Sequence, residues 1–197
     1  MCGRYALHAN PEVVALQFGL DALPGFKPSY NVCPGSDVLV IRGRRKASLL
    51  RWGAGNRMIN ARAETVDERP AFRNAFRQWR CLVPASGFYE WQSVAGRKQP
   101  WYVLPTERQL FALGGIVLLW QGVRSVAIVT TAANELMAKI HDRMPVLVAP
   151  ESYDAWLGTG DASALLAPAP DDAMQAHPVS VRVNAPANDD EALLQPI

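Results

Sequence analysis

The sequence predicts an α+β fold: one domain over residues 1–197, in which a mostly antiparallel, curled sheet forms a barrel-like core with a few flanking helices. Three observations favour this class. The chain has 197 residues, of which 49% are hydrophobic, and this suits a single domain with a packed core. Strand-like segments outnumber helical ones, and helices do not alternate with strands as they would in a doubly wound fold. No internal repeat and no hinge linker divides the chain.

Helical signals occur in a few segments. Asn10-Pro11 predicts an N-cap and a first helical residue, and Gly19 predicts the end of that helix. Over residues 67–80 an apolar stripe lies beside a basic stripe, which predicts a helix that packs on the core and presents arginines to a ligand or to solvent. These stripes consist of Phe72, Phe76 and Trp79 and of Arg69, Arg73, Arg77 and Arg80. Further helices are expected over 132–140 and 150–157.

Short apolar and β-branched runs predict the strands. They cover residues 38–41, 48–52, 81–84, 87–91, 101–104, 110–119, 126–131, 145–148 and 178–183. The first two would be joined by a basic hairpin tip over 42–46, which is either a phosphate contact or a solvated loop.

Charge is unevenly distributed along the chain. Residues 1–100 hold 15 Lys/Arg against 7 Asp/Glu, whereas residues 101–197 hold 5 against 11, which gives the net charge of +2. Such asymmetry indicates that the first half faces a polyanion. Most of the cations are arginine, whose planar guanidinium suits phosphate.

Composition also argues against several classes of protein. No apolar run reaches the ~18–20 residues of a membrane span, and no apolar segment typical of a secretory signal follows Arg4. We therefore expect a cytoplasmic protein, and a monomer as the simplest state. The cysteines Cys2, Cys33 and Cys81 lack metal-ligand spacing, so neither a metal nor an organic cofactor is expected. Cys33 and Cys81 should be small buried hydrophobes.

The second residue, Cys2, is a candidate nucleophile. Removal of Met1 would leave an amine and a thiol on neighbouring carbons, a pair that reacts with aldehydes to give an imine and then a five-membered thiazolidine. An α-amino group titrates near ~7.7–8.0 and a thiol near ~8.5, so both reactive forms are accessible around neutral pH. The alternative is that Cys2 has no chemical role and is an incidental feature of an exposed N-terminus.

Three further side chains could serve this chemistry. Glu90 is a lone carboxylate among aromatic residues, where desolvation would make it a general acid unless it is simply paired with an arginine. His141 could exchange protons with a substrate or only cap a helix end. Asn60 could orient a hydroxyl or only hold a loop.

Seven sequence blocks follow one another in a defined order. They are Cys2; Asn31-Val32-Cys33-Pro34-Gly35; Asn60-Ala61-Arg62-Ala63-Glu64-Thr65; Gly87-Phe88-Tyr89-Glu90-Trp91; Thr130-Thr131-Ala132-Ala133-Asn134; His141-Asp142-Arg143-Met144-Pro145; and His177-Pro178-Val179-Ser180 with Val183-Asn184. In this order they resemble the SRAP family, the SOS-response-associated peptidases, also described as abasic-site processing proteins. The resemblance extends to the terminal Gln195-Pro196-Ile197.

The resemblance implies a DNA-damage function. Family members bind single-stranded DNA that contains an abasic site, and their N-terminal cysteine joins the sugar aldehyde as a thiazolidine that shields the lesion. By this resemblance Cys2 would be the nucleophile, Asn60 would position it or the sugar, Glu90 would be the principal acid/base, and His141 would assist imine formation and ring opening. The resemblance also implies removal of the chain's own leader methionine by peptidase activity, lyase or cross-link reversal chemistry, and a nucleoid location on damaged DNA.

The DNA contacts follow from two arguments. By the resemblance, Arg4 and Arg62 would face the phosphates beside the lesion, and Thr130 would lie near the reacting centre. An abasic site has no base to read, so binding must rest on phosphates and on stacking of the flanking bases. Arg73 and Arg77 of the basic stripe are therefore further candidate DNA contacts.

One departure from the family pattern concerns a loop. In the family a Trp-Gly pair leads into a longer loop that props the DNA open, whereas here Trp52-Gly53 is followed by Ala54-Gly55-Asn56-Arg57. A weaker preference for strand junctions is expected. Likewise, Arg69 and Pro70 replace the spacing of a DNA-facing arginine.

Two other functions stay open at this point. An N-terminal-nucleophile cysteine peptidase or amidohydrolase would use Cys2 on small amides, with its own amine as the base. A non-catalytic single-strand-binding module would not need Cys2 at all.

Overall fold

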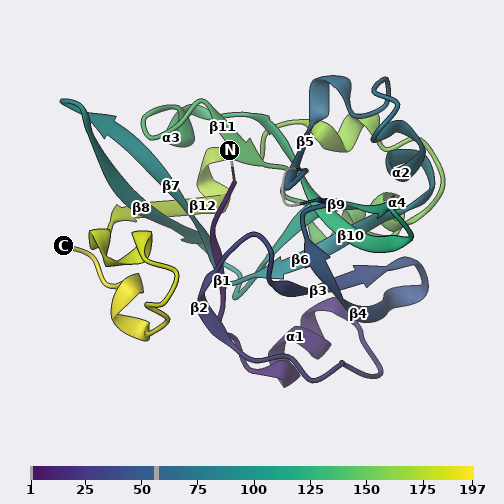
Figure 1. Cartoon of the computed structure of the whole chain (residues 1–197), viewed down its shortest axis with the longest axis horizontal. Coiled ribbons are helices and arrows are strands. Elements are labelled where there is room, and N and C mark those ends of the chain that lie inside the picture. The colour runs from purple at the N-terminus through teal and green to yellow at the C-terminus, as the bar shows by residue number, and fades with distance from the viewer. Residues whose placement is uncertain (1, 56–57) are drawn as a thin grey trace.

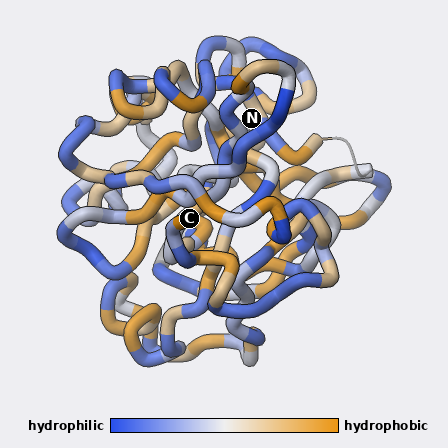
Figure 2. Tube along the Cα trace, turned by 90° about the vertical axis from the view of Figure 1, so that its left-hand side faces the viewer, coloured by the Kyte–Doolittle hydropathy of each residue, from blue (hydrophilic) through white to orange (hydrophobic). Residues whose placement is uncertain are grey.

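The computed structural model describes residues 2–55 and 58–197, and two β-sheets with short helices around them make up the fold (Figure 1). The predicted α+β class with a mostly antiparallel, curled sheet is confirmed. In Figure 2, short hydrophobic stretches are interspersed with hydrophilic ones along the chain. Among the described residues, no helix has the length and apolar character needed to cross a membrane.

The larger sheet forms the barrel. Its strand order is β11–β10–β4–β3–β6–β9, β5 also pairs with β10, and an added β9–β10 pairing closes strands β10, β4, β3, β6 and β9 into a ring. Among the described strands of this sheet, β10 pairs in parallel with β4 and with β5, and the other pairs are antiparallel. The strands are β3 (Asp37–Arg42), β4 (Lys46–Trp52), β5 (Asn60–Arg62), β6 (Arg80–Ala85), β9 (Phe111–Trp120), β10 (Val123–Ala132) and β11 (Arg143–Pro145).

The second sheet is antiparallel throughout and has the strand order β12–β8–β7–β1–β2. Its strands are β1 (Tyr5–Leu7), β2 (Ser29–Val32), β7 (Gly87–Val94), β8 (Arg97–Pro105) and β12 (Met174–Pro178). β7 and β8 form a long hairpin that extends to the left in Figure 1. The start of the chain therefore lies between β2 and β7, next to the barrel.

The helices are short. They are α1 (Pro11–Phe18), α2 (Arg73–Gln78), α3 (Glu135–Ala138) and α4 (Tyr153–Leu157). α1 has the predicted ends: the Asn10 side chain accepts a hydrogen bond from the Glu12 N–H at 3.0 Å, and Gly19 takes a left-handed conformation with φ of 59°. The helix expected over 150–157 is a 3₁₀ turn over Pro150–Ser152 followed by α4.

Several predicted strand boundaries are wrong, and three strands were missed. Residues 178–183 do not form a strand, because β12 ends at Pro178 and the Ser180 side chain caps a 3₁₀ turn over Val181–Asn184. The strand expected over 145–148 is instead β11, at 143–145. The missed strands β1, β2 and β5 have three or four residues each, too few for a periodic pattern to identify them.

The long helix predicted over 67–80 is also wrong. Residues before Phe72 form turns, in which the Glu68 and Arg69 N–H groups both donate to Thr65 O, and only α2 is helical. Pro70 within the segment disfavours a helical conformation of Arg69. Phe72 and Phe76 do point inward, but Trp79 remains 41% exposed. The helix over 132–140 is shorter too, because β10 continues to Ala132 and Asn134 caps α3.

Arg80 does not belong to an exposed basic stripe. It is only 4% exposed, and its guanidinium donates to the carbonyl oxygens of Phe76, Trp156, Gly158 and Gly160 at 2.6–2.7 Å. Burial lowers the pKa of the guanidinium. Arg80 therefore joins α2 and β6 to the end of α4 and has a structural role.

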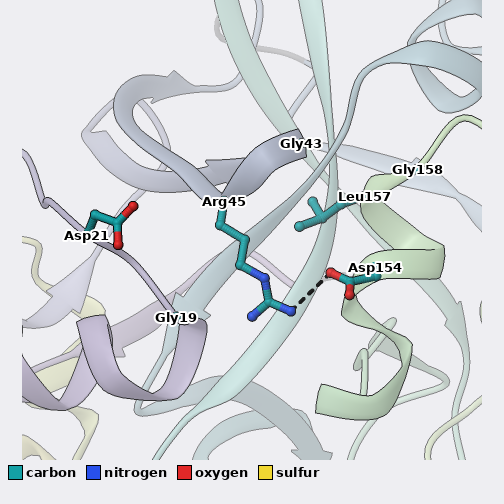
Figure 3. A pocket seen from close by; sticks show the side chains of 7 residues that line it. All are labelled: Gly19, Asp21, Gly43, Arg45, Asp154, Leu157 and Gly158. Carbon is teal, nitrogen blue, oxygen red and sulfur yellow. Dashed lines mark hydrogen bonds and ion pairs between the residues drawn. The ribbon is translucent and has the colours of Figure 1, made fainter.

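In the basic hairpin tip over 42–46, the Arg45 side chain is also held by contacts within the protein. Figure 3 shows the Arg45 side chain reaching towards Asp154 on α4, with which it forms an ion pair at 3.0 Å. The same guanidinium donates to Phe18 O at 3.1 Å, at the end of α1. Arg45 therefore connects α1, the hairpin tip and α4, and a phosphate would have to compete with these partners.

The cysteine expectation is confirmed in part. Cys81 is fully buried in the core, with Trp156 Nε1 donating to its carbonyl oxygen at 2.8 Å. Cys33, in contrast, is only partly buried, so it is not the enclosed hydrophobe that its neighbours suggested. All three cysteines are free thiols.

Replacement of Arg80 should be strongly destabilising. Arg80→Ala would leave four carbonyl groups without their charged donor, of which those of Phe76 and Trp156 are in buried hydrogen bonds, and we expect a loss of about 3 kcal/mol or more in the free energy of unfolding. Arg77→Ala is the matched control, because Arg77 is exposed on the same helix and should change stability by no more than about 0.5 kcal/mol. Urea denaturation of both variants tests this. Equal, small effects would contradict a structural role for Arg80.

Candidate functional site

Cys2 lies just before β1 in the interior of the protein. Its exposed fraction is 0%, and its carbonyl oxygen accepts a hydrogen bond from Asn60 Nδ2 at 3.0 Å. Desolvation by burial, together with the nearby charge of Glu90, raises the pKa of the Cys2 thiol. The Cys2 sulfur is therefore held as a neutral thiol in an enclosed site, and not on an exposed terminus.

Glu90 reaches Cys2 through strand register. β1 pairs with β7 so that Tyr5 lies opposite Phe88, and the Tyr89 N–H donates to Arg4 O at 2.9 Å. Continuing this antiparallel register past Tyr5 brings Glu90 level with Gly3, next to Cys2. The Glu90 side chain is 3% exposed, and desolvation raises the pKa of its carboxyl. The predicted desolvated carboxyl is therefore present beside the thiol.

His141 stands between Glu90 and solvent. Its Nε2 is 3.9 Å from Glu90 Oε2, and its side chain is 25% exposed. On the other edge of the ring, Nδ1 lies 3.0 Å from the Arg143 backbone nitrogen, whose N–H it accepts when the imidazole is neutral. Nδ1 also lies 2.9 Å from Asp142 Oδ1, with which a protonated imidazole would form an ion pair. Both protonation states of the imidazole thus have partners, which suits a group that exchanges protons.

Asn60 completes the group from the opposite sheet. It begins β5, which pairs in parallel with β10 so that Asn60 lies opposite Ile128. Its Nδ2 donates to Cys2 O and also to Ile59 O at 2.9 Å. Its Oδ1 is buried and accepts no hydrogen bond within the described ranges, so it is available to a donor on a ligand.

An arginine and a glutamate that sequence reasoning did not assign flank this group. Arg143 forms an ion pair with Glu64, and its Nη2 donates to Glu64 Oε2 at 3.0 Å and to Thr130 Oγ1 at 3.3 Å. Its hydrogen bond to Glu64 lowers the pKa of that carboxyl. Glu64 lies in the same sequence block as Asn60, and Arg143 lies in the same block as His141. Their presence in these blocks could have identified them as site residues from the sequence.

The predicted DNA contacts differ in how available they are. Arg62 is exposed on β5 opposite Thr130, close to the site. Thr130 itself is 0% exposed and bonded to Arg143. Arg4 is partly buried, and its Nη1 donates to Asn31 Oδ1 at 2.8 Å and to Val183 O. The Arg4 guanidinium also lies 5.9 Å from the Trp91 ring centroid.

Arg73 and Arg77 are exposed but lie elsewhere in the fold. They are on α2, which packs on β6 and β9, and Figure 1 labels α2 on the right and β7 on the left. The structure therefore does not bring these two arginines to Cys2. Trp52 is fully buried and donates to Ile59 O at 3.0 Å, which closes the short loop that follows it. Asn56-Arg57 of that loop lie outside the described residues.

Together, Cys2, Asn60, Glu90 and His141 form one site from four separate segments. In the described part of the chain, no group of three or more His, Cys, Asp or Glu side chains has the geometry to hold a metal ion. The site combines a thiol, a desolvated carboxyl, an imidazole and an amide. This set suits nucleophilic addition to a carbonyl with proton transfer.

Comparisons with known proteins agree with the fold and the sequence pattern. The family model described as "SOS response associated peptidase (SRAP)" matches residues 1–186. The abasic site processing protein YoaM of Bacillus subtilis is 37% identical, with 98% of this chain and 97% of YoaM covered. The abasic site processing protein YedK of Escherichia coli is 28% identical over the full length of both chains.

Solved structures show the same architecture. A Bacteroides thetaiotaomicron protein superposes with a TM-score of 0.87 at 24% identity over all of both chains, which supports the fold. A phage-related protein of Bordetella bronchiseptica has a TM-score of 0.74 at 28% identity, covering 90% of this chain and 94% of that one. The chain therefore belongs to the SOS response associated peptidase (SRAP) family.

Proposed function

We propose that this protein binds single-stranded DNA at abasic sites and that Cys2, once Met1 is removed, forms a covalent thiazolidine with the ring-opened sugar. The observation that carries the proposal is the convergence of Cys2, Glu90, His141 and Asn60 in one enclosed site. The names of its relatives, which are abasic site processing proteins, support the same substrate.

The proposed reaction balances with the loss of one water. The Cys2 amine adds to the aldehyde carbon to give a carbinolamine, and expulsion of its hydroxyl as water gives an imine. Because an acid supplies the proton that leaves with the hydroxyl, the imine is protonated on nitrogen. The thiol sulfur then bonds to the imine carbon, the electron pair of the C=N bond goes to the nitrogen, and the thiol proton returns to the conjugate base of that acid. Ring closure is intramolecular, and such reactions reach effective molarities of order ~10⁵ M or more. The product is a stable five-membered ring that blocks the aldehyde.

Glu90 is suited to the proton transfers that this sequence needs. Because its pKa is raised by desolvation, its carboxyl retains a proton at higher pH than an exposed glutamate does. It would donate that proton to the sugar ring oxygen or to the leaving hydroxyl. The carboxylate left behind would then take the proton from the Cys2 thiol, whose own raised pKa keeps it protonated without a base.

His141 and Asn60 would support these transfers. The partly exposed His141 can pass protons between Glu90 and solvent, since its Nε2 lies 3.9 Å from the carboxylate. The buried Oδ1 of Asn60, which accepts no hydrogen bond from the residues that the structure describes, would accept one from a sugar hydroxyl, while its Nδ2 holds the Cys2 carbonyl. Asn60 thus fixes the nucleophile and the sugar relative to each other.

DNA binding itself should depend on phosphates more than on bases. An abasic nucleotide presents no base edge, so affinity must come from the backbone and from stacking of neighbouring bases. Arg62 is the candidate phosphate contact next to the site, because its side chain is exposed and it is two residues from Asn60 on β5. The family name also implies a peptidase activity, which we assign to removal of Met1 by the same site. Cleavage of the DNA strand by lyase chemistry, or reversal of the cross-link, would use Glu90 and His141 again.

The covalent product provides the first test. Mature protein mixed with an oligonucleotide that bears one abasic site should give a stoichiometric adduct on a denaturing gel. Cys2→Ala, or retention of Met1, should abolish the adduct, because either removes one of the two reacting groups. Cys33→Ala is the matched control and should leave the yield unchanged.

A protein that binds the oligonucleotide normally but gives no adduct would contradict the proposal. If it instead hydrolyses small amides in a Cys2-dependent way, the amidohydrolase alternative is correct. Intact mass spectrometry of the starting protein shows whether Met1 has been removed.

The acid/base role of Glu90 gives a kinetic prediction. Glu90→Gln keeps the shape of the side chain but carries no transferable proton, so the rate of adduct formation should fall by roughly 10²-fold or more. Single-turnover rates at saturating DNA measure this. Glu12→Gln, on the exposed face of α1, serves as a control. An unchanged rate in Glu90→Gln would remove Glu90 from the mechanism.

The raised pKa of Glu90 also predicts how stability changes with pH. The folded state binds this proton more tightly than the unfolded chain, so the stabilisation is complete below the unfolded pKa of ~4.3 and is lost as pH rises through the folded pKa. Glu90→Gln lacks this dependence. Relative to wild type, the variant should therefore gain stability across that window, by ~1.4 kcal/mol for each unit by which the pKa is raised.

Urea denaturation from about pH 4 to pH 8 measures this difference. Glu64→Gln should show the opposite trend when the titration is extended below pH ~4, because the Arg143 hydrogen bond lowers the pKa of Glu64 and wild type loses that stabilisation as pH falls through the folded pKa. A pH-independent difference between wild type and Glu90→Gln would contradict the desolvation argument.

A further inference from the structure

Exposed apolar side chains gather at the turn end of the β9–β10 hairpin. Leu119 is 73% exposed, Trp120 47% and Val123 60%, and the neighbouring Trp79 at the end of α2 is 41% exposed. Such clusters on a protein surface mark interaction sites, because they otherwise cost free energy in water. With Arg124, these residues form what we call the hairpin-end patch: Trp79, Leu119, Trp120, Val123 and Arg124.

The patch combines its aromatic rings with positive charge. The Arg124 guanidinium carbon lies 5.5 Å from the centroid of the Trp79 ring, in a cation–π arrangement. Shallow hollows flank Trp79, one beside Arg77 and the other beside Arg124, and no acidic side chain is among the described residues that line them. Arg73 on α2 is exposed as well. This charge favours a polyanionic partner.

Aromatic side chains beside arginines are the composition that binds single-stranded nucleic acid. Bases stack on the rings regardless of sequence, and cations track the phosphates. An apolar protein partner would gain nothing from the unopposed arginines. The patch therefore fits a DNA strand better than it fits a second protein.

The patch is also connected to the site around Cys2. Trp120 packs close to Gly55, where an added Cβ would come within 3.3 Å of Trp120 Nε1, and Gly55 belongs to the β4–β5 connection that ends at Asn60. β10 itself runs from Arg124 in the patch to Thr130 at the site. Six residues of extended strand span ~20 Å, and a stacked strand advances ~3.4 Å per nucleotide, so the separation corresponds to about six nucleotides.

We propose that the hairpin-end patch is a second DNA-contact surface, on which bases of the strand that flanks the abasic site stack about six nucleotides from the lesion. This inference rests on the proposed function, since it supplies the flanking strand to the Cys2 site. Leu119 pairs with Arg124 and Trp120 with Val123. Because side chains alternate along a strand, Trp120 lies on the face of the hairpin end opposite Arg124, whose guanidinium lies over Trp79. The patch therefore wraps around the hairpin end, with Trp79 beside one face and Trp120 on the other. Each face would offer one stacking ring.

The length of DNA on either side of the abasic site distinguishes a role of the hairpin-end patch from a role of the Cys2 site. Two oligonucleotides would be compared, each with one abasic site, one with about two and the other with about twelve flanking nucleotides on each side. On the long substrate at subsaturating concentration, Trp79→Ser with Trp120→Ser should lower the second-order rate of adduct formation by roughly 10-fold or more, since each stacked base contributes ~1–3 kcal/mol. Arg124→Glu alone should lower it in the same direction, because it places an anion where the phosphates would meet a cation. On the short substrate the same variants should react like wild type.

Leu16→Ser is the matched control, because Leu16 is 86% exposed on α1, away from the hairpin. Equal rates of wild type and variants on the long substrate would overturn the proposal, as would an equal loss on both substrates. So would wild-type dimers in sedimentation that the variants abolish without any change in DNA binding, because the patch would then be a contact between copies.

A binding assay distinguishes failure of the patch proposal from failure of the proposed cross-linking reaction. Fluorescence anisotropy with an undamaged long oligonucleotide needs no adduct, and the patch variants should bind it roughly 10-fold more weakly than wild type or Leu16→Ser. Quenching of the exposed tryptophans on DNA binding should be lost in Trp79→Ser with Trp120→Ser. Unchanged affinity in this assay overturns the patch even if the cross-link forms.

Discussion

The site depends on the burial of one carboxyl, that of Glu90, beside the Cys2 thiol. β7 is covered on both faces: Phe88 packs in the main core, while Tyr89 packs with Val179, Val183 and Leu193 of the C-terminal segment. Because side chains alternate along a strand, Glu90 points to the same side as Phe88 and so into the interior. Desolvation there raises the pKa of Glu90 and, together with its charge, that of Cys2. A single environment thereby favours the neutral form of both the carboxyl and the thiol.

The C-terminal segment is held over the second sheet by a polar clamp. The buried Asn31 side chain donates to the carbonyl oxygens of Val183, Ala185 and Asn188, and its Oδ1 accepts from Arg4. Trp91 Nε1 donates to Asn184 Oδ1 at 2.8 Å. These contacts join sequence blocks that are far apart in the chain and hold the C-terminal segment on the face of the second sheet opposite Glu90. They also make Arg4 a structural residue as well as a candidate phosphate contact.

Much of the fold could be predicted because its signals are local. The Asn10 cap, the Gly19 stop, the strands on either side of the 42–46 tip and the strand-rich α+β class all follow from neighbouring residues. The helix over 67–80 was wrong because periodicity alone did not register the turns around Thr65 and Arg69. Strands β1 and β5 are defined by partners more than twenty residues away in sequence, and no local pattern reports such pairing. The arginines show the same limit, since Arg45 and Arg80 look like ligand contacts in the sequence but are held by Asp154 and by buried carbonyl groups.

The sequence by itself determined the family, the order of the reactive residue types and the identity of Cys2, Asn60, Glu90 and His141 as candidates, because these depend on residue type and spacing along the chain. Only the tertiary structure decided that the four meet, that Thr130 is enclosed behind Arg143 and Glu64, and that Arg73 and Arg77 face another part of the surface. It also decided which groups lose water, and hence the pKa shifts. The physical reason is that desolvation and charge interaction depend on distance in space, which strand pairing sets between residues far apart in sequence.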